Sequence, residues 1–337
     1  MKRFLVLAFA MMMVFAMVAC SPAVEQPSTP EEPAAEAPAD VEEPAPDGEA
    51  PAEGDKILIG ISAPNNANEA NMQMNQGIED YLKTIDNVEI LLLDAEGKGE
   101  NHLNHAETFI TKGVDVAIVS PYDAAAGQSA VEMLIEAGIP TITLKAAIAD
   151  NSICSYVGQD DTIAGEMEMQ WIADKLGGKG NIVVIEGPTG NSAAILRNEG
   201  INNILAKYPD IKVLHTQTGN WNREEGMALM ENWLQAGEQI DAVVGHNDEM
   251  ALGAYDALVD AGKAGQMLVI GIDAIDAAKA SVAKGEMNAT VLQDSYGIGK
   301  LGIEIAVKLA QGETLEDNYF VDPVLLTIDN IGDYYTE

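Results

Sequence analysis

Polar side chains stand directly after several short apolar runs of the sequence, where they could hold a small polar molecule. Ser62 and Asn66 come at the end of the first run and just beyond it, and Lys145 follows the fourth run. Later runs are followed by Trp221, Asn247, Asp273 and Gln293. Amide and carboxylate groups pair with hydroxyl groups, and an indole stacks on the C–H face of a ring. The set is therefore typical of a site for a neutral, polyhydroxylated ligand, although Asn, Asp and Ser at strand ends are also ordinary turn and helix-capping residues.

Two other motifs could indicate different chemistry, and each lacks a required part. Ser192 stands in a string similar to a nucleophile elbow, but the second glycine of that motif is missing. We interpret Ser192 as a helix cap and predict no catalytic residue. His102 and His105 are three residues apart on an expected helix, but no third ligand is near, so we predict surface or core histidines and no metal site. No phosphate-loop spacing is present, and we predict no cofactor.

Alternation of apolar runs with amphipathic stretches predicts the fold. The strand candidates are 57–61, 88–93, 116–119, 141–144, 181–185, 213–216, 242–244, 268–270 and 289–292, and the helix candidates are 72–84, 124–137, 162–176, 192–208, 224–236 and 250–261. Continuous apolar strands between helices indicate parallel sheets covered on both faces. So many strands favour two doubly wound sheets, with 155–158 as the passage between units. Ligands bind beyond the carboxyl ends of such strands.

The first 55 residues are typical of export and tethering. Lys2 and Arg3 precede an apolar run that stops at Cys20, which predicts a signal peptide over 1–20. The string MVAC at 17–20 resembles a bacterial lipoprotein cleavage box, which implies acylation of Cys20. Residues 21–55 are almost wholly Pro, Ala, Glu and Asp, which predicts a disordered acidic tether. We therefore expect a lipid-anchored protein outside the cytoplasm, at the cell surface or in the periplasm.

The net charge bears on nucleic acid as a partner, and the cysteine content bears on disulfide bonding. The net charge is −36, and without a Lys/Arg cluster the chain cannot neutralise phosphates, so nucleic acid is excluded as a partner. If Cys20 carries lipid, Cys154 has no partner for an intrachain disulfide.

Several strings resemble the periplasmic ribose-binding protein family. They are NN at 65–66, GNSAA at 190–194, NDEMALGA at 247–254, GID at 271–273 and ATVLQ at 289–293, and the resemblance runs in order from residue 56 to about 327. It implies a type I solute-binding fold, which is a two-lobed α/β clamp. Its three crossing segments would lie near 156–157, 294–295 and 321–322. The lobes would then be 56–157 plus 294–321 and 158–293 plus 322–337.

The same resemblance implies site residues and a function. Ser62, Asn66, Trp221, Asn247, Asp273 and Gln293 match ligand-contacting positions. Glu69 stands where the family has an aromatic residue, and Lys145 stands where it has an acid. We expect these two to contact the ligand or to neutralise each other across the pocket; the alternative is that the segment around Asn68 is shifted and Glu69 points to solvent. The family's middle arginine aligns with Ile195, and Arg197 is expected to face elsewhere. Because the first lobe differs this much, ribose is not favoured.

The implied function is capture of a sugar, cyclitol or derivative for the permease of an ABC importer, without catalysis. Sugar-responsive repressors share the fold, but the chain has no basic helix-turn-helix head. A receptor that reports to a chemoreceptor or kinase stays open as an alternative, because both partners would recognise closed lobes. A nucleoside or an autoinducer-like compound also stays open as the ligand.

Overall fold

The computed structural model describes residues 56–336. The predicted signal peptide, the acidic tether and Cys20 lie outside the described residues, so those predictions are not tested. Among the residues from 56 to 336, no helix combines the length and the apolar character needed to cross a membrane.

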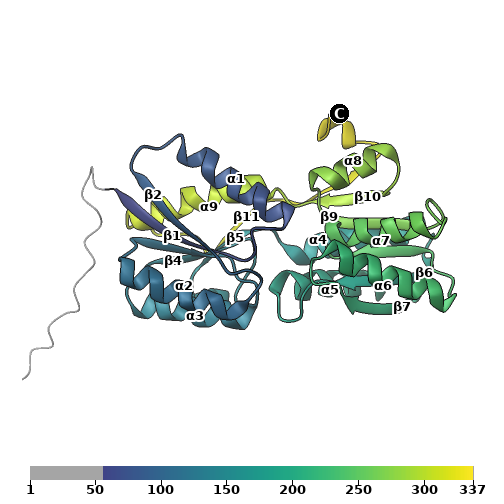
Figure 1. Ribbon diagram of the computed structural model, residues 1–337, viewed down its shortest axis with the longest axis horizontal. Coiled ribbons are helices and arrows are strands. Elements are labelled where there is room, and N and C mark those ends of the chain that lie inside the picture. The colour runs from purple at the N-terminus through teal and green to yellow at the C-terminus, as the bar shows by residue number, and fades with distance from the viewer. Residues whose placement is uncertain (1–55, 337) are drawn as a thin grey trace, which may run out of the picture. The chain divides into compact units, whose positions relative to one another are not determined.

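A six-stranded parallel sheet in the order β2-β1-β3-β4-β5-β11 forms the first lobe (Figure 1). Its strands are β1 (Ile57–Ala63), β2 (Val88–Asp94), β3 (Val116–Val119), β4 (Thr141–Leu144), β5 (Ser155–Gly158) and β11 (Asn318–Phe320). Helices α1 (Glu69–Leu82) and α9 (Ser295–Ala310) cover one face, and α2 (Gly99–Lys112) and α3 (Ala124–Glu136) cover the other. A short 3-10 turn, η1 (Asn151–Ile153), precedes β5.

Side-chain alternation along β1 shows why its sequence is apolar without interruption. Ile57 and Ile59 pack in the cluster formed with α1 and α9, whereas Leu58 packs against the cluster of α2 and α3. Successive strand residues point to opposite faces, and both faces are covered here. Gly60 has the ring of Phe109 so close that a Cβ atom would lie 2.8 Å from it. The sheet is thus held between two apolar layers.

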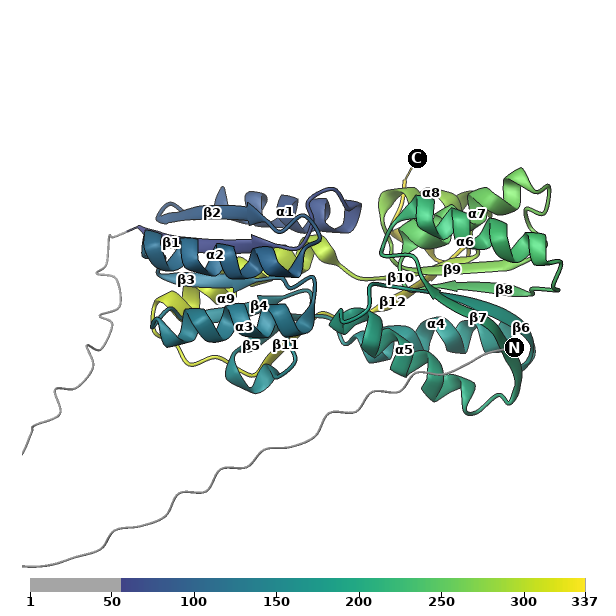
Figure 2. The same cartoon turned by 60° about the horizontal axis from the view of Figure 1, so that its bottom comes forward.

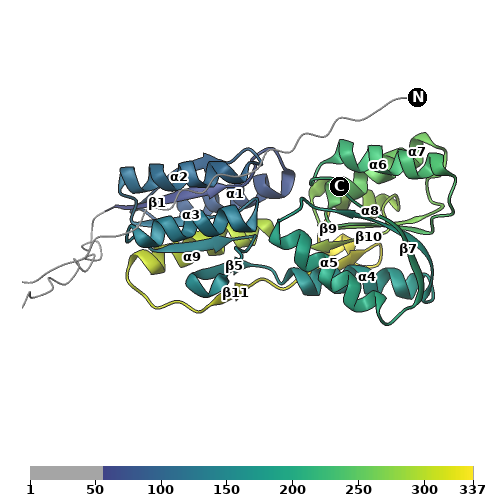
Figure 3. The same cartoon turned by 90° about the horizontal axis from the view of Figure 1, so that it is seen from below.

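A second six-stranded sheet in the order β7-β6-β8-β9-β10-β12 forms the second lobe, as Figure 2 shows from another side. Its strands are β6 (Lys179–Glu186), β7 (Asp210–Thr218), β8 (Ala242–Gly245), β9 (Leu268–Asp273), β10 (Ala289–Leu292) and the antiparallel β12 (Val324–Thr327). Helices α4 (Asp161–Lys175) and α5 (Ser192–Leu205) pack on one face. Helices α6 (Arg223–Ala236), α7 (Asp248–Asp260) and α8 (Asp276–Lys284) pack on the other, and η2 (Ile331–Asp333) follows β12 (Figure 3).

A close approach between α4 and α5 depends on glycine. A Cβ atom on Gly165 would lie 2.2 Å from the carbonyl oxygen of Arg197, and one on Gly200 would lie 2.2 Å from that of Thr162. Side chains at these positions would push the helices apart. The two glycines therefore allow α4 and α5 to pack closely, and this packing sets the position of Arg197 within the second lobe.

Three segments connect the two sheets, at 159–160, 293–294 and 321–323. The predicted fold class, with two parallel-sheet α/β lobes, is confirmed. The interpretation of 155–158 as a passage between units was wrong, because these residues form β5, which pairs with β4 and β11. Strands β11 and β12 and helices α8 and α9 are absent from the predicted elements. The strands are only three and four residues long, and α9 carries Gly297, Gly299 and Gly302, which weaken a helical pattern.

Candidate ligand-binding site

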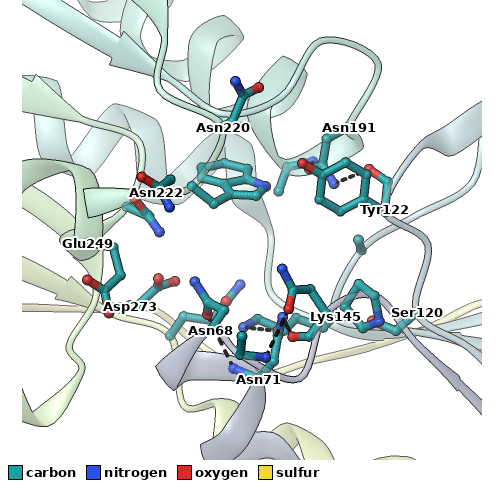
Figure 4. A pocket seen from close by; sticks show the side chains of 18 of the residues that line it. Asn68, Asn71, Ser120, Tyr122, Lys145, Asn191, Asn220, Asn222, Glu249 and Asp273 are labelled. Atoms are coloured by element: carbon teal, nitrogen blue, oxygen red, sulfur yellow. Dashed lines mark hydrogen bonds between the residues drawn. The ribbon is translucent and has the colours of Figure 1, made fainter. Parts of the chain in front are cut away.

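A pocket of about 430 Å³ lies between the two lobes, at the carboxyl ends of strands from both sheets. Figure 4 shows its lining, in which amide side chains predominate. The first lobe contributes Asn65, Asn68, Asn71, Ser120, Tyr122 and Lys145, and the second contributes Asn191, Arg197, Asn220, Trp221, Asn222, Asn247, Glu249 and Asp273. Such a lining offers many hydrogen-bond donors and acceptors together with two aromatic rings.

Arg197 is the central cation of the second-lobe wall. Its side chain is only 3% exposed, and its Nε donates to Asp161 Oδ1 at 2.8 Å, while NH1 donates to the carbonyl oxygen of His246. The carboxylate of Asp273 lies 3.9 Å from NH1. We expected this arginine to face elsewhere, and that expectation was wrong. Ile195, the aligned position, is 55% exposed instead, because the α4–α5 contact turns the Arg197 face of α5 inward.

Trp221 presents its ring to the pocket from a turn with left-handed backbone. The φ angles of Asn220 and Trp221 are 53° and 61°, and the indole lies against Gly187, where a Cβ atom would be 2.1 Å from the ring. The guanidinium of Arg197 lies 5.6 Å from the ring centroid, within the range of a cation–π contact. The indole is therefore held by its contacts with Gly187 and Arg197, and it lines the pocket.

Asp273 ends β9 in a backbone conformation that L-residues rarely adopt. Its φ is 127° and that of Ala274 is 53°. The turn is held by two hydrogen bonds, from Ala274 N to Thr290 Oγ1 at 3.2 Å and from Ile275 N to Asp248 Oδ2 at 3.0 Å. Burial raises the pKa of Asp273, although Lys145 and Arg197 oppose the rise. Strain of this kind persists only where surrounding contacts impose it, and it is common at binding sites.

Lys145 is the cation of the first-lobe wall. It follows β4 with a φ of 65°, and Nζ donates to Asn71 Oδ1 at 3.1 Å, as Figure 4 shows. The hydroxyl of Tyr156 lies 3.2 Å from the Lys145 carbonyl oxygen and 3.1 Å from that of Gln159, so its one proton is shared between the two. Enclosure in the cleft lowers the pKa of Lys145 to about 8, with the charge of Asp273 opposing the change. An ammonium group has three donors, so Nζ retains donors for a ligand.

Tyr122 is positioned by a buried chain of side chains behind the pocket. Its backbone N–H donates to His102 Nε2 at 3.0 Å, so the proton of the neutral ring is on Nδ1 and is donated to Ser62 Oγ at 2.7 Å. The Ser62 hydroxyl is then left to donate to His105 Nδ1 at 2.8 Å. Burial lowers the pKa of His102 to about 4, and His105 reinforces the effect. Burial lowers the pKa of His105 as well, and the charge of Asp94 opposes this.

Direct hydrogen bonds join the two lobes. Asn191 Nδ2 donates to Tyr122 O at 2.8 Å, Ala124 N donates to Gly190 O at 3.0 Å, and Ala147 N donates to Ser192 Oγ at 2.8 Å. The Ser192 hydroxyl thus serves as an interlobe acceptor. Its helix is capped by Asn191, whose side chain accepts from the backbone N–H groups of Ala193 and Ala194, so the reading of Ser192 as the cap was wrong.

Five of the eight predicted ligand-binding residues line the pocket, namely Lys145, Trp221, Asn247, Asp273 and Gln293. The other three lie outside its lining. Ser62 is buried against α2, because β1 continues to Ala63 and the side chain points to that helix. Asn66 Oδ1 accepts from Asn75 at 2.9 Å, and Glu69 accepts from the backbone of Asp276 at 2.8 Å. Lys145 and Glu69 therefore have separate partners.

Several lining residues are missing from the predicted set. Tyr122 and Asn191 follow the ends of β3 and β6, so the strand-end rule could have included them. Asn68 and Asn71 belong to the first turn of α1, and Arg197 lies in the second turn of α5. No strand-end signal marks such positions, since the packing of each helix decides which side chains reach the cleft.

The fold and the interlobe pocket define a class of two-lobed binding proteins, and comparisons give the family. Residues 59–314 match a family model described as a periplasmic binding protein domain, so the chain belongs to this extracytoplasmic family of binding proteins. A xylitol-binding protein of Mycolicibacterium smegmatis is 37% identical over 286 residues, which are 84% of this chain and 81% of that protein. The ribose import binding protein of Bacillus subtilis is 33% identical over 261 residues, or 77% and 84% of the two chains. An ABC transporter solute binding protein from Bacillus halodurans, solved with bound myo-inositol, matches with a TM-score of 0.81 and 34% identity over 84% of this chain and 98% of that one.

Proposed function

We propose that this protein captures a small neutral polyol or sugar between its lobes and delivers it to an ABC importer. The observation that carries the proposal is the chemistry of the pocket. Amides from both lobes line the pocket together with Trp221, a combination that matches hydroxyl groups on a compact carbon skeleton.

The balance of charge around the pocket favours a neutral ligand. Lys145 and Arg197 supply two enclosed positive charges, while Asp161 and Asp273 supply two negative ones. At the rim, Arg223 pairs with Glu249 at 2.7 Å. A charged ligand would leave one enclosed charge without a counterpart, which is costly in a site of low dielectric. Hydroxyl groups can instead donate to Asp273 and accept from Lys145 without changing the balance.

The relatives support the same ligand class. Two of these relatives are named for xylitol and ribose, and the solved structure holds myo-inositol. All three compounds are small and polyhydroxylated. We infer that Lys145, Trp221, Asn247, Asp273 and Gln293 contact the ligand directly. In this arrangement Trp221 stacks on the carbon skeleton, and the polar groups fix the orientation of its hydroxyls.

We further propose that the protein is held at the membrane by a lipid on Cys20, with the acidic segment as a spacer. Replacement of Cys20 by alanine should move the protein from the membrane fraction of its native cells to the soluble fraction. Metabolic labelling with a fatty acid should be lost in the same variant. Retention of label by Cys20→Ala would rule out this anchor.

The ligand proposal is tested with the purified protein and a panel of pentoses, hexoses, linear polyols and cyclitols. A ligand at 100 times its dissociation constant stabilises the folded protein by about 2.7 kcal/mol, so a true ligand gives a clear thermal shift. Trp221→Ala should weaken the ligand so identified by at least about tenfold. Trp171→Ala is the matched control, because this residue of α4 packs against the apolar cluster of the second lobe, does not line the pocket and should leave affinity unchanged.

Two results would overturn the proposal. One is a panel in which no polyhydroxylated compound shifts the unfolding temperature. The other is equal affinity in the folded Trp221→Ala variant and the parent. Delivery to an importer is measured as uptake of the labelled ligand by cells with and without the protein, and unchanged uptake would favour a sensory role instead.

A further inference from the structure

Helix α8 of the second lobe is capped by a side chain of the first lobe. The residue before the helix, Ile275, cannot supply a side-chain cap, and the N–H of Asp276 donates to Glu69 Oε1 at 2.8 Å. Glu69 is the first residue of α1, and 207 positions of sequence separate the two partners. The first N–H groups of a helix need acceptors, and a carboxylate is favoured at that end.

This contact continues the series of hydrogen bonds that holds the strained turn at Asp273. Three consecutive N–H groups follow that residue, and each donates to a different side chain. Ala274 donates to Thr290 and Ile275 donates to Asp248, both within the second lobe, whereas Asp276 donates to Glu69 of the first lobe. Only the third bond breaks when the lobes separate.

Glu69 is not required as the cap of its own helix. Asn68 Oδ1 already accepts from the N–H groups of Ala70 and Asn71, at 3.1 and 3.4 Å. The Glu69 carboxylate is therefore directed across the cleft, where it lies half-buried near groups of three second-lobe helices. Burial raises its pKa, as do the charges of Asp276 and Glu249, while the bond to the Asp276 N–H and the charge of Arg223 oppose this.

We propose that Glu69 is a latch: it caps α8 only when the lobes are closed, and by completing the turn it positions Asp273 for the ligand. The inference rests on the proposed function, because capture between the lobes requires closure. Glu69 is accordingly a positioning residue that does not touch the ligand. It stabilises the closed form by the same amount whichever polyol occupies the pocket.

The test compares Glu69→Ala with Glu69→Gln and with a matched control, Glu100→Ala. Glu100 is the acidic first-turn residue of α2 in the same lobe and is exposed. Loss of one charge-assisted hydrogen bond should speed ligand dissociation about five- to tenfold in Glu69→Ala. Glu69→Gln keeps an acceptor oxygen and should recover part of this loss, and Glu100→Ala should behave as the parent. The probes are xylitol, ribose, myo-inositol and any compound that the panel identifies.

Closure itself is measured by single-molecule energy transfer between dyes at Lys112→Cys and Lys284→Cys, with Cys20 and Cys154 replaced by serine. Both lysines are exposed, and they end α2 and α8 on opposite lobes. Glu69→Ala should lower the ratio of closed to open molecules by the same five- to tenfold, with ligand and without it. This readout does not depend on knowing the ligand.

The outcomes separate the latch from the proposed function. An unchanged closed fraction and dissociation rate in folded Glu69→Ala would overturn the latch. A loss of affinity confined to one of several ligands would also overturn it, because it would make Glu69 a ligand contact. A parent protein in which no compound alters the closed fraction would instead contradict the proposed function.

Discussion

The neutral imidazole of His102 makes the protein sensitive to acid, and the structure gives the size of the effect. Protonation would place a second N–H at Nε2, directly opposite the N–H of Tyr122, and the hydrogen bond between them would become a repulsion. The pKa of His102 is lowered from 6.5 to about 4 by burial first and by His105 second. The unfolded chain therefore takes up this proton at a higher pH than the folded protein does.

The direction and magnitude follow from this difference in pKa. Stability that comes from the neutral ring is fully present above pH 6.5 and is lost as the pH falls towards 4. A difference of two and a half pH units corresponds to about 3 kcal/mol, of which about 2 kcal/mol should be lost by pH 4.5. Asp248 works in the opposite direction, since burial raises its pKa to about 8, so the effect must be isolated by a variant.

The contribution of His102 to the loss of stability in acid is isolated by urea denaturation of the parent and of His102→Gln at pH 7.0 and 4.5. Glutamine leaves an acceptor near the N–H of Tyr122 but does not titrate, so the variant should be less stable at pH 7 and lose about 2 kcal/mol less on acidification. His215→Gln is the control, because His215 lies at the surface beside Glu238 and His102 remains in place. If folded His102→Gln lost as much stability between the two pH values as the parent does, the assigned cause would be refuted.

Three further predictions concern the pocket. Gly187→Ala should displace the Trp221 ring, because the new Cβ would lie 2.1 Å from it, and calorimetry should show affinity reduced by at least about tenfold with the fold retained; equal affinity would contradict the position of the ring. Affinity should fall as the pH rises through about 8, where Lys145 loses its proton, and Lys145→Met should bind more weakly and without this dependence; a pH dependence that persists in Lys145→Met would have another origin. If binding shifts an open population to the closed one, saturating ligand should reduce the radius of gyration measured by small-angle scattering, and an unchanged radius would argue against the clamp.

Sequence patterns predicted the parts of this structure that depend on periodicity and on strand ends. Apolar runs located the central strands, and the strand-end rule placed Trp221 and Asp273 at the pocket. The rule failed for Ser62 because a strand one or two residues longer than predicted turns a terminal residue into an internal one. Arg197 was misplaced for another reason, since the glycine contacts between α4 and α5 that turn it inward involve residues far apart in the sequence. The trans-lobe role of Glu69 depends on how two lobes meet, which no local pattern encodes.

The second and third crossing segments have a consequence for biogenesis. Helix α9 and strand β11 belong to the first lobe, yet they follow the whole of β6 to β10 in the chain, and β12 completes the second sheet only at 324–327. Ile298, Ile303 and Ile305 of α9 are buried in the first lobe's core, so a nascent chain that has emerged only to residue 293 leaves that core uncovered. The first lobe cannot finish folding before α9 is available, and the second cannot before β12 is, because contacts this distant in sequence form late. An exported chain is thereby kept from completing its native structure until α9 and β12 have been synthesised, and an incompletely folded chain is what a translocation channel needs to thread.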